Sequence, residues 1–381
     1  ISTGGINPGS SLVNSLWTGQ YATIRDANWF MENVGKAGLS DTALAQYLGQ
    51  VRFFRAWAHY KLMYQFGDIP VVTKLLAINE GQVEPTSRDA VLDFVLSELD
   101  QSLVELSSSN YNPEYGRITK WAVMALKSRI LLYEGTLASD NSMLTESADL
   151  ASVIMSGGFG LHESYTELFR PEGEGSSEII LARVNADLEG RYHSLGQWLG
   201  PISFHASWTT YSPTKALVER YPDINGEDIS TSPLYDSDMP FINRDPRLNQ
   251  TIFNWNEEVD YEGSMFVNNG TWLNFRKWID PAETAEQRSH IDFIVFRLGE
   301  VYLNYVEAMN EVNGPSQDLL DLIIQLVIIT GTLEWEQLFG KTLLLLMPLE
   351  DRTFTAPRDY VWPIPDFELI NNPKLKQNTG Y

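Results

Sequence analysis

The five histidines of the chain are the first residues to consider for metal chemistry. They are His59, His162, His193, His205 and His290; no pair has the helical spacing of a zinc site, and the H-E-x-x-H motif does not occur. The sequence contains no cysteine, which excludes a thiolate ligand, a thiol nucleophile and a disulfide. A metal centre is therefore not predicted.

Two short segments contain part of a nucleotide-binding motif. Phe339-Gly340-Lys341-Thr342 has the end of a phosphate loop, but Trp335 stands where the first glycine is required. Gly158-Phe159-Gly160 lacks the third glycine of a dinucleotide-binding turn, because Glu163 occupies that position. Neither motif is complete, and no cofactor is predicted.

Acidic residues could serve as calcium ligands or as a hydrolytic pair. Asp223-Ile224-Asn225-Gly226, followed by Asp228, is rich in ligand oxygens, but its glycine comes too early for an EF-hand loop, which favours a turn. Glu300 and Glu307 lie seven apart on one predicted helix face, and among 50 acidic residues such pairs arise by chance. We therefore predict no catalytic residues and no enzyme activity.

Composition and charge limit the possible partners. The chain has 381 residues, 43% hydrophobic and 20% charged, which is typical of a globular protein. Its 27 basic and 50 acidic residues give a net charge of −23, which repels phosphate backbones, so we predict no nucleic-acid partner. Aromatic residues reach 12%, including 11 tryptophans, which is consistent with an exposed stacking surface for a flat ligand. The most apolar stretch, Leu319–Thr330, is shorter than the about 20 residues that span a bilayer.

Helical periodicity dominates the first 156 residues. A helix is predicted over Ala43–Phe66, after an N-cap at Ser40, and its broad apolar surface indicates packing on two sides. The sequence Gly67-Asp68-Ile69-Pro70 ends it, because proline cannot continue a helix. Further helices are predicted after caps at Thr86 and Ser87, from Thr119 to Gly135, over Ala148–Met155 and over Arg297–Asn313.

Residues 157 to 290 have a different pattern, in which short strand-like runs such as Glu178–Val184 alternate with Gly, Pro, Asn and Asp clusters. The helices resemble tetratricopeptide pairs, although no strict 34-residue repeat is present. We predict a mainly α fold of tetratricopeptide-like antiparallel helix pairs with an irregular, loop-rich insert containing short strands. The predicted single domain, 1–381, comprises a helical scaffold (1–156 and 293–347), the insert (157–292) and an extended C-terminal tail (348–381).

Four separate segments share a recognisable pattern along most of the chain. They are Phe53-Phe54-Arg55-Ala56 with Gly67-Asp68-Ile69-Pro70, then Asn243–Leu248, then Phe296–Ala308, and finally Trp362-Pro363-Ile364-Pro365 with Gln377–Tyr381. In order and spacing they resemble the SusD/RagB family, the surface-exposed nutrient-binding lipoproteins of Bacteroidetes outer membranes. In physical terms these segments hold the fold: Asp245-Pro246 is a turn whose flanking Arg244 and Arg247 can bond carbonyls, and the proline-rich end is an extended segment over the helices.

The resemblance implies a function. It implies non-catalytic binding of glycans or oligopeptides at the cell surface, with the protein acting as the lid of a SusC-like TonB-dependent outer-membrane transporter. The location it implies is the extracellular face of the outer membrane, with membrane contact only through a lipid anchor that the chain itself does not contain. The alternative is a structural or interaction subunit of an outer-membrane barrel complex without a small ligand. The residues do not decide between glycan and peptide.

The candidate ligand-binding residues lie between Arg191 and Tyr211, in a segment without helical or strand periodicity. Indole rings stack on sugar or peptide faces, and tyrosine adds a hydrogen-bonding tip. The segment precedes a predicted helix over Pro213–Arg220, as ligand-bearing loops do in the family. The alternative is that its aromatic residues cover the core beneath a long loop. The candidates are Tyr192, His193, Trp198, Trp208 and Tyr211.

The apolar run Leu319–Met347 departs from the family, which carries Arg- and Glu-rich helices there. We predict two antiparallel helices packed against the helix Arg297–Asn313, because nothing else in the chain could cover so much apolar surface.

Overall fold

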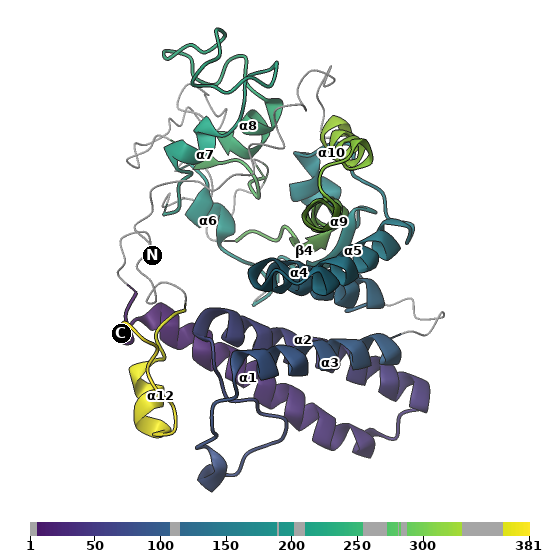
Figure 1. Ribbon diagram of the computed structural model, residues 1–381, viewed down its shortest axis with the longest axis vertical. Helices are drawn as coiled ribbons and strands as arrows, with labels where there is room; N and C mark the ends of the chain where they lie inside the picture. The colour runs from purple at the N-terminus through teal and green to yellow at the C-terminus, as the bar shows by residue number, and fades with distance from the viewer. Residues whose placement is uncertain are drawn as a thin grey trace. The chain divides into compact units, whose positions relative to one another are not determined.

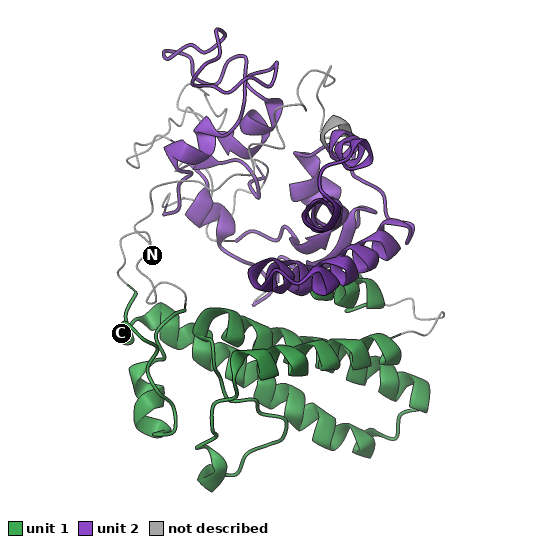
Figure 2. Cartoon of the chain, in the orientation of Figure 1, with its two compact units in different colours: residues 1–127, 349–381 green, residues 128–348 purple. Residues whose placement is uncertain are grey.

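The computed structural model of the protein describes residues 6–106, 115–188, 190–201, 210–253, 273–280, 282, 288–329 and 361–381. The chain divides into two compact units, residues 1–127 with 349–381 and residues 128–348 (Figure 2). The single domain over 1–381, with the internal boundaries given above, stays a prediction.

Three long helices, α1 (Ser11–Asn33), α2 (Asp41–Phe66) and α3 (Arg88–Glu105), form the framework of the first unit (Figure 1). α2 packs against both α1 and α3, which confirms the two-sided packing predicted from its broad apolar surface. α2 begins after the predicted cap, where the Ser40 hydroxyl accepts a hydrogen bond from the Ala43 N–H, and ends at Gly67, whose φ of 76° favours glycine. α1 has no counterpart among the individually predicted helices.

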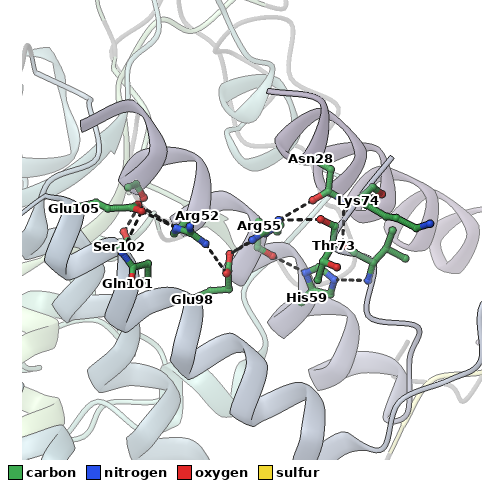
Figure 3. Close-up of polar contacts among 12 residues, drawn as sticks. Asn28, Arg52, Arg55, His59, Thr73, Lys74, Glu98, Gln101, Ser102 and Glu105 are labelled. Carbon is green, nitrogen blue, oxygen red and sulfur yellow. Dashed lines mark hydrogen bonds and ion pairs between the residues drawn. The ribbon is translucent and has the colours of Figure 1, made fainter. Parts of the chain in front are cut away.

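A buried polar network joins the three helices and explains the arginine of the first family segment (Figure 3). Arg55 is only 6% exposed; its Nε donates to Glu98 at 2.8 Å, and its Nη1 donates to the Asn28 side chain at 2.9 Å. One turn further along α2, His59 Nδ1 lies 2.8 Å from the Arg55 carbonyl, and its Nε2 accepts from the Val72 N–H. Except for the contact between His59 and Arg55, which lies within α2, each of these contacts ties α2 to another part of the first unit, so the segment holds the fold.

The described part of the C-terminal tail, residues 361–381, lies against α2, as predicted. The Trp362 N–H donates to the Gln65 carbonyl at 2.5 Å, and the Asn378 side-chain amide donates to the Phe66 carbonyl at 2.9 Å. Asn372, at the end of the short helix α12 (Asp366–Asn371), donates to the Val83 carbonyl. The first two contacts satisfy carbonyls in the last turn of α2, which have no intrahelical partner, and the third holds the connection between α2 and α3.

In the second unit, α5 (Asn141–Met155) packs against α9 (Leu298–Asn313), and Leu132 of α4 (Lys120–Ala138) joins the same apolar cluster. Two predicted helix boundaries are wrong. α4 continues through Gly135 to Ala138. Gly135 is used for packing inside the helix and not to end it, because it lets Met143 of α5 approach α4 closely: a Cβ at Gly135 would lie 3.0 Å from the Met143 Cβ. α5 begins at Asn141 rather than Ala148, because the Asp140 carboxylate caps its first turn.

α10 (Gln317–Ile329) packs against α9, which confirms the first half of the predicted apolar helix pair. Its Leu319 is 6% exposed. The second helix, predicted to end at Met347, lies outside the described residues.

The insert contains short elements, as predicted from its composition. β1 (Ile179–Arg183) corresponds to the run Glu178–Val184 and pairs antiparallel with β4 (Phe293–Arg297), which lies just beyond the predicted end of the insert. Within the insert, β2 (Ile252–Phe253) pairs with β3 (Asn274–Phe275). The described part of the insert also contains the 3₁₀ helices η3 (Glu167–Phe169) and η4 (Pro171–Gly173) and the short α-helices α6 (Leu195–Leu199), α7 (Lys215–Glu219) and α8 (Pro246–Thr251). The mainly α fold with a loop-rich insert is confirmed.

Candidate ligand-binding site

The predicted site segment contains α6, the short helix that carries Trp198. The structure describes Tyr192, His193, Trp198 and Tyr211, whereas Trp208 lies outside the described residues. The four described residues differ in their contacts: the His193 ring binds the backbone, whereas Trp198, Tyr211 and Tyr192 make ring contacts.

His193 positions the start of α6. Its backbone pairs with that of Ser289 through two hydrogen bonds of 2.9 and 2.8 Å. Its ring Nδ1 accepts from the Leu195 N–H at 3.2 Å, and its Nε2 lies 2.9 Å from the Ile291 carbonyl, so the hydrogen-bond network assigns the neutral ring with the proton on Nε2. Both ring nitrogens therefore contact the backbone, and His193 acts by holding the loop.

Trp198 and Tyr211 form an exposed aromatic pair. Their side chains are 40% and 55% exposed, and their ring centroids lie 6.2 Å apart in an edge-to-face arrangement with an interplanar angle of 69°. The Tyr211 N–H donates to the Trp198 carbonyl at 3.0 Å, which fixes the two backbones against each other. Such a pair combines an indole face with a phenol tip that can donate or accept a hydrogen bond, which is the chemistry of a stacking site.

The end of α6 is fixed by β3 and the turn that follows it. The Gly200 N–H caps the helix on the Gly196 carbonyl, and the Asn274 side chain donates to the Gly200 carbonyl at 3.2 Å. A Cβ at Gly200 would lie 2.8 Å from the Gly196 oxygen and 3.2 Å from Ile279, so this position requires glycine. Trp198 is thus carried by a helix that is held at both ends.

Tyr192 contacts a cation at the edge of the segment. The Arg288 guanidinium lies 5.0 Å from the centroid of its ring, and Arg288 also faces Asp187 at 3.9 Å. The side chains of this ion pair are 49% and 69% exposed, so the pair is well solvated and of small energetic weight.

Lys277 is a residue that sequence reasoning missed. Its ammonium lies 3.7 Å from the centroid of the Phe169 ring and 3.5 Å from the Tyr165 hydroxyl. Burial lowers the pKa of this ammonium to about 8, and the neighbouring Arg297 charge acts in the same direction. The next residue, Trp278, has a φ of 68°, so the turn that contacts Gly200 through Ile279 is strained and firmly packed. A single lysine in a loop has no motif that could have identified it.

The Asn243–Leu248 segment supports the loops around α7. Arg244 is 5% exposed and donates from Nη2 to the carbonyls of Val218 and Tyr221, both at 2.6 Å, as predicted for a carbonyl-binding arginine. Arg247 instead binds the carboxylate of Asp245, which caps α8. These contacts hold the fold of the insert.

Asp223 belongs to a turn, as predicted. Its Oδ1 accepts from the N–H groups of Asn225 and Glu227, both at 2.8 Å, and its Oδ2 accepts from the Ser232 hydroxyl. Among the residues that the structure describes, no group of three or more His, Cys, Asp or Glu side chains could hold a metal ion.

Family comparisons agree with the motifs and the fold. A model of the SusD family matches residues 177–327, and a model described as starch-binding proteins associating with the outer membrane matches residues 6–132. The chain belongs to the SusD/RagB family. Within the described ranges, no helix is long and apolar enough to cross a membrane.

Relatives of this SusD/RagB chain are known from sequence and structure. SusD-like protein P25 of Formosa agariphila is 28% identical over 353 residues, which cover 85% of this chain and 64% of the relative. The match to a second curated relative, from Bacteroides ovatus, covers 57% of that protein, so the chain spans about three-fifths of the length of these two.

Two solved structures share the fold. A SusD-like carbohydrate-binding protein of Bacteroides fragilis has a TM-score of 0.82 at 20% identity, covering 98% of this chain and 88% of the other. A laminarin-binding SusD-like protein has a TM-score of 0.71 at 20% identity, covering 99% and 87% of the two chains.

Proposed function

We propose that the protein is a non-catalytic binding protein for glycans, and that Trp198 and Tyr211 are its main ligand contacts. The observation that carries the proposal is the exposed edge-to-face pair, in which Trp198 lies on a helix held at both ends and the Tyr211 backbone is hydrogen-bonded to Trp198. Pyranose rings present apolar C–H faces and hydroxyl edges, which match an indole face and a phenol hydroxyl. Tyr192 and Trp208 are proposed as supporting contacts, and His193 as the residue that positions the loop.

Family membership supports the wider role. The relatives include proteins that bind carbohydrate and, in one case, laminarin, which favours a glycan over the oligopeptide that the sequence left open. We propose that the protein works at the extracellular face of the outer membrane, held by a lipid anchor. There it would act as the lid of a SusC-like TonB-dependent transporter and deliver bound glycan to it, with closure of the lid coupling capture to transport.

The proposal is tested by titration calorimetry of the purified protein with laminari-oligosaccharides, xylogluco-oligosaccharides, malto-oligosaccharides and a peptide pool. Binding of one glycan class without release of hydrolysis products is expected. Trp198→Ala should cost about 2 kcal/mol, or roughly 30-fold in Kd, as truncation of a central aromatic contact does. Trp198→Phe should restore part of the loss, because it keeps a ring face.

Tyr133→Ala is the matched control, because Tyr133 is 43% exposed on α4 and belongs to no predicted site. Unchanged affinity in a Trp198→Ala, Tyr211→Ala double variant would remove this pair from the site. Binding of peptides alone would replace the glycan assignment. Binding of none of these probes would favour the alternative, a structural subunit of a barrel complex.

A further inference from the structure

A second group of exposed aromatic residues lies in the first unit, around the connection from α1 to α2. It encloses a hollow of about 330 Å³, near the lower limit of the about 300–1,000 Å³ typical of small-molecule sites. The connection contains a short 3₁₀ helix, η1 (Val34–Ala37). The lining residues are Trp29, Phe30, Asn33, Val34, Ala37, Leu39 and Tyr47.

Trp29 and Tyr47 present open ring surface at this hollow. Trp29 is 58% exposed, Tyr47 is 40% exposed and Leu39 is 38% exposed. The packing of α1 against the rest of the unit does not account for Trp29, because α1 buries Ile24, Ala27 and Asn28 on its other side. A large ring left in water beside a concave surface is a feature of binding surfaces rather than of cores.

The Tyr47 ring and the end of α1 beside it are held in place by their neighbours. Phe30 and Tyr47 contact each other with centroids 6.3 Å apart, and the Arg117 guanidinium lies 5.6 Å from the Tyr47 centroid. The Asn33 side chain donates to the Trp29 carbonyl at 2.8 Å and accepts from the Lys36 ammonium at 2.6 Å. The hollow is therefore a built surface, with a polar edge at Asn33 and Lys36.

The uncharged lining of the hollow indicates a neutral, hydroxylated ligand, because the two cations beside it, Lys36 and Arg117, already face Asn33 and the Tyr47 ring. None of the lining residues is charged, although the chain carries a net charge of −23. Lys36 has three N–H donors, of which one is directed to Asn33, and the Asn33 oxygen has a second lone pair. Ring faces beside a few hydrogen-bonding groups suit a pyranose ring, whereas a basic protein partner would require carboxylates that this lining lacks.

We propose that Trp29 and Tyr47 form a second glycan-binding surface, which stacks on the rings of a neutral polysaccharide. This inference rests on the proposed function, because it assumes that the protein's ligand is a glycan. A polysaccharide carries many equivalent rings, so a protein with two binding surfaces retains it more strongly than a protein with one.

The test is native gel electrophoresis of the full chain through gels that contain laminarin, xyloglucan or starch. The variants are Trp29→Ala, Tyr47→Ala, Trp198→Ala and the Trp29→Ala, Trp198→Ala double variant. We expect Trp29→Ala to weaken retention by the bound polymer about 5- to 30-fold, as loss of one stacked ring does, and the double variant to migrate as in a gel without polymer. Tyr64→Ala is the matched control, because Tyr64 lies on α2 like Tyr47, is 48% exposed and does not line the hollow.

The outcomes separate the two proposals. Normal retention of Trp29→Ala and Tyr47→Ala, together with lost retention of Trp198→Ala, overturns the second surface and leaves the proposed function intact. Lost retention of Trp29→Ala with normal retention of Trp198→Ala supports the second surface and removes the first. If no polymer is retained by the wild type, both fail. Light scattering adds one further outcome: an oligomeric wild type that Trp29→Ala converts to monomers assigns the hollow to self-association and overturns the glycan surface.

Discussion

Glu98 offers a direct test of what holds the first unit together, because it is the carboxylate between two arginines. Its Oε2 accepts from Arg55 Nε at 2.8 Å and Nη2 at 2.6 Å, and its Oε1 accepts from Arg52 Nη1 at 2.8 Å. The Arg55 and Glu98 side chains are 7% and 9% exposed, so little water can replace a lost contact.

Glu98→Gln keeps the shape of the side chain and removes its charge. An amide NH₂ would then face one of the two guanidinium groups, and Arg55 would keep only neutral partners, the Asn28 oxygen and the Thr73 carbonyl. Because breaking a buried ion pair leaves an uncompensated charge, we expect a loss of about 3–5 kcal/mol in the free energy of unfolding.

Glu105→Gln is the matched control. Glu105 binds Arg52, which is 21% exposed and keeps Glu98 as a partner, so its loss should cost about 1 kcal/mol or less. A double variant, Arg55→Met with Glu98→Leu, should be more stable than Glu98→Gln alone, because it removes both charges and leaves apolar packing.

Urea unfolding followed by tryptophan fluorescence and circular dichroism measures these differences as shifts of the midpoint at constant m-value. Equal costs for Glu98→Gln and Glu105→Gln would refute the argument from burial, because the two carboxylates are buried to a similar degree and share Arg52, and of the two only Glu98 pairs with the buried Arg55.

Three further predictions concern single residues. Burial lowers the pKa of His59 to about 4, so the unfolded chain takes up a proton at a higher pH than the folded protein does. The free energy of unfolding should therefore fall by about 3 kcal/mol as pH falls from 6.5 to 4, and urea titrations of His59→Gln should lack this dependence. The pKa of Lys277 is about 8 in the folded protein and near 10.4 in the unfolded chain. The free energy of unfolding should therefore rise between about pH 8 and 10.4, compared with that of Lys277→Met, and parallel pH curves for the two proteins would contradict the lowered pKa. Gly200→Ala should cost about 1–3 kcal/mol in thermal unfolding and weaken glycan binding, whereas unaffected binding would mean that α6 need not hold its position.

Much of the helical scaffold could be predicted from local signals. Ser40 and Gly67 mark the ends of α2 because capping and left-handed backbone act within a few residues. The prediction that α4 ends at Gly135 was wrong because this glycine serves tertiary packing. It permits the close approach of Met143, and nothing in the neighbouring sequence distinguishes that use from a helix end. The start of α5 could have been found from Asp140, a cap residue placed before the predicted range.

The candidate site was less predictable than the scaffold. Trp198 and Tyr211 stood out because aromatic residues clustered without periodicity, and they do form an exposed pair. The structural use of His193 depends on Ser289 and Ile291, about a hundred residues away in sequence, so no local pattern could reveal it. The same holds for Lys277, whose aromatic neighbours Tyr165 and Phe169 come from a distant segment.

In the described part of the insert, the polar side chains of His193, Asp223 and Arg244 stabilise the fold. Both His193 ring nitrogens contact the backbone, the Asp223 carboxylate accepts two hydrogen bonds within its own turn and one from Ser232, and Arg244 binds carbonyls. Groups held in this way are poorly suited to accept or donate protons to a ligand, whereas the ring faces of Trp198 and Tyr211 remain open to it. Stacking discriminates weakly between sugars of similar shape, because every pyranose offers an apolar face. We therefore expect selectivity to come from the length and linkage of the glycan chain more than from the identity of any one sugar.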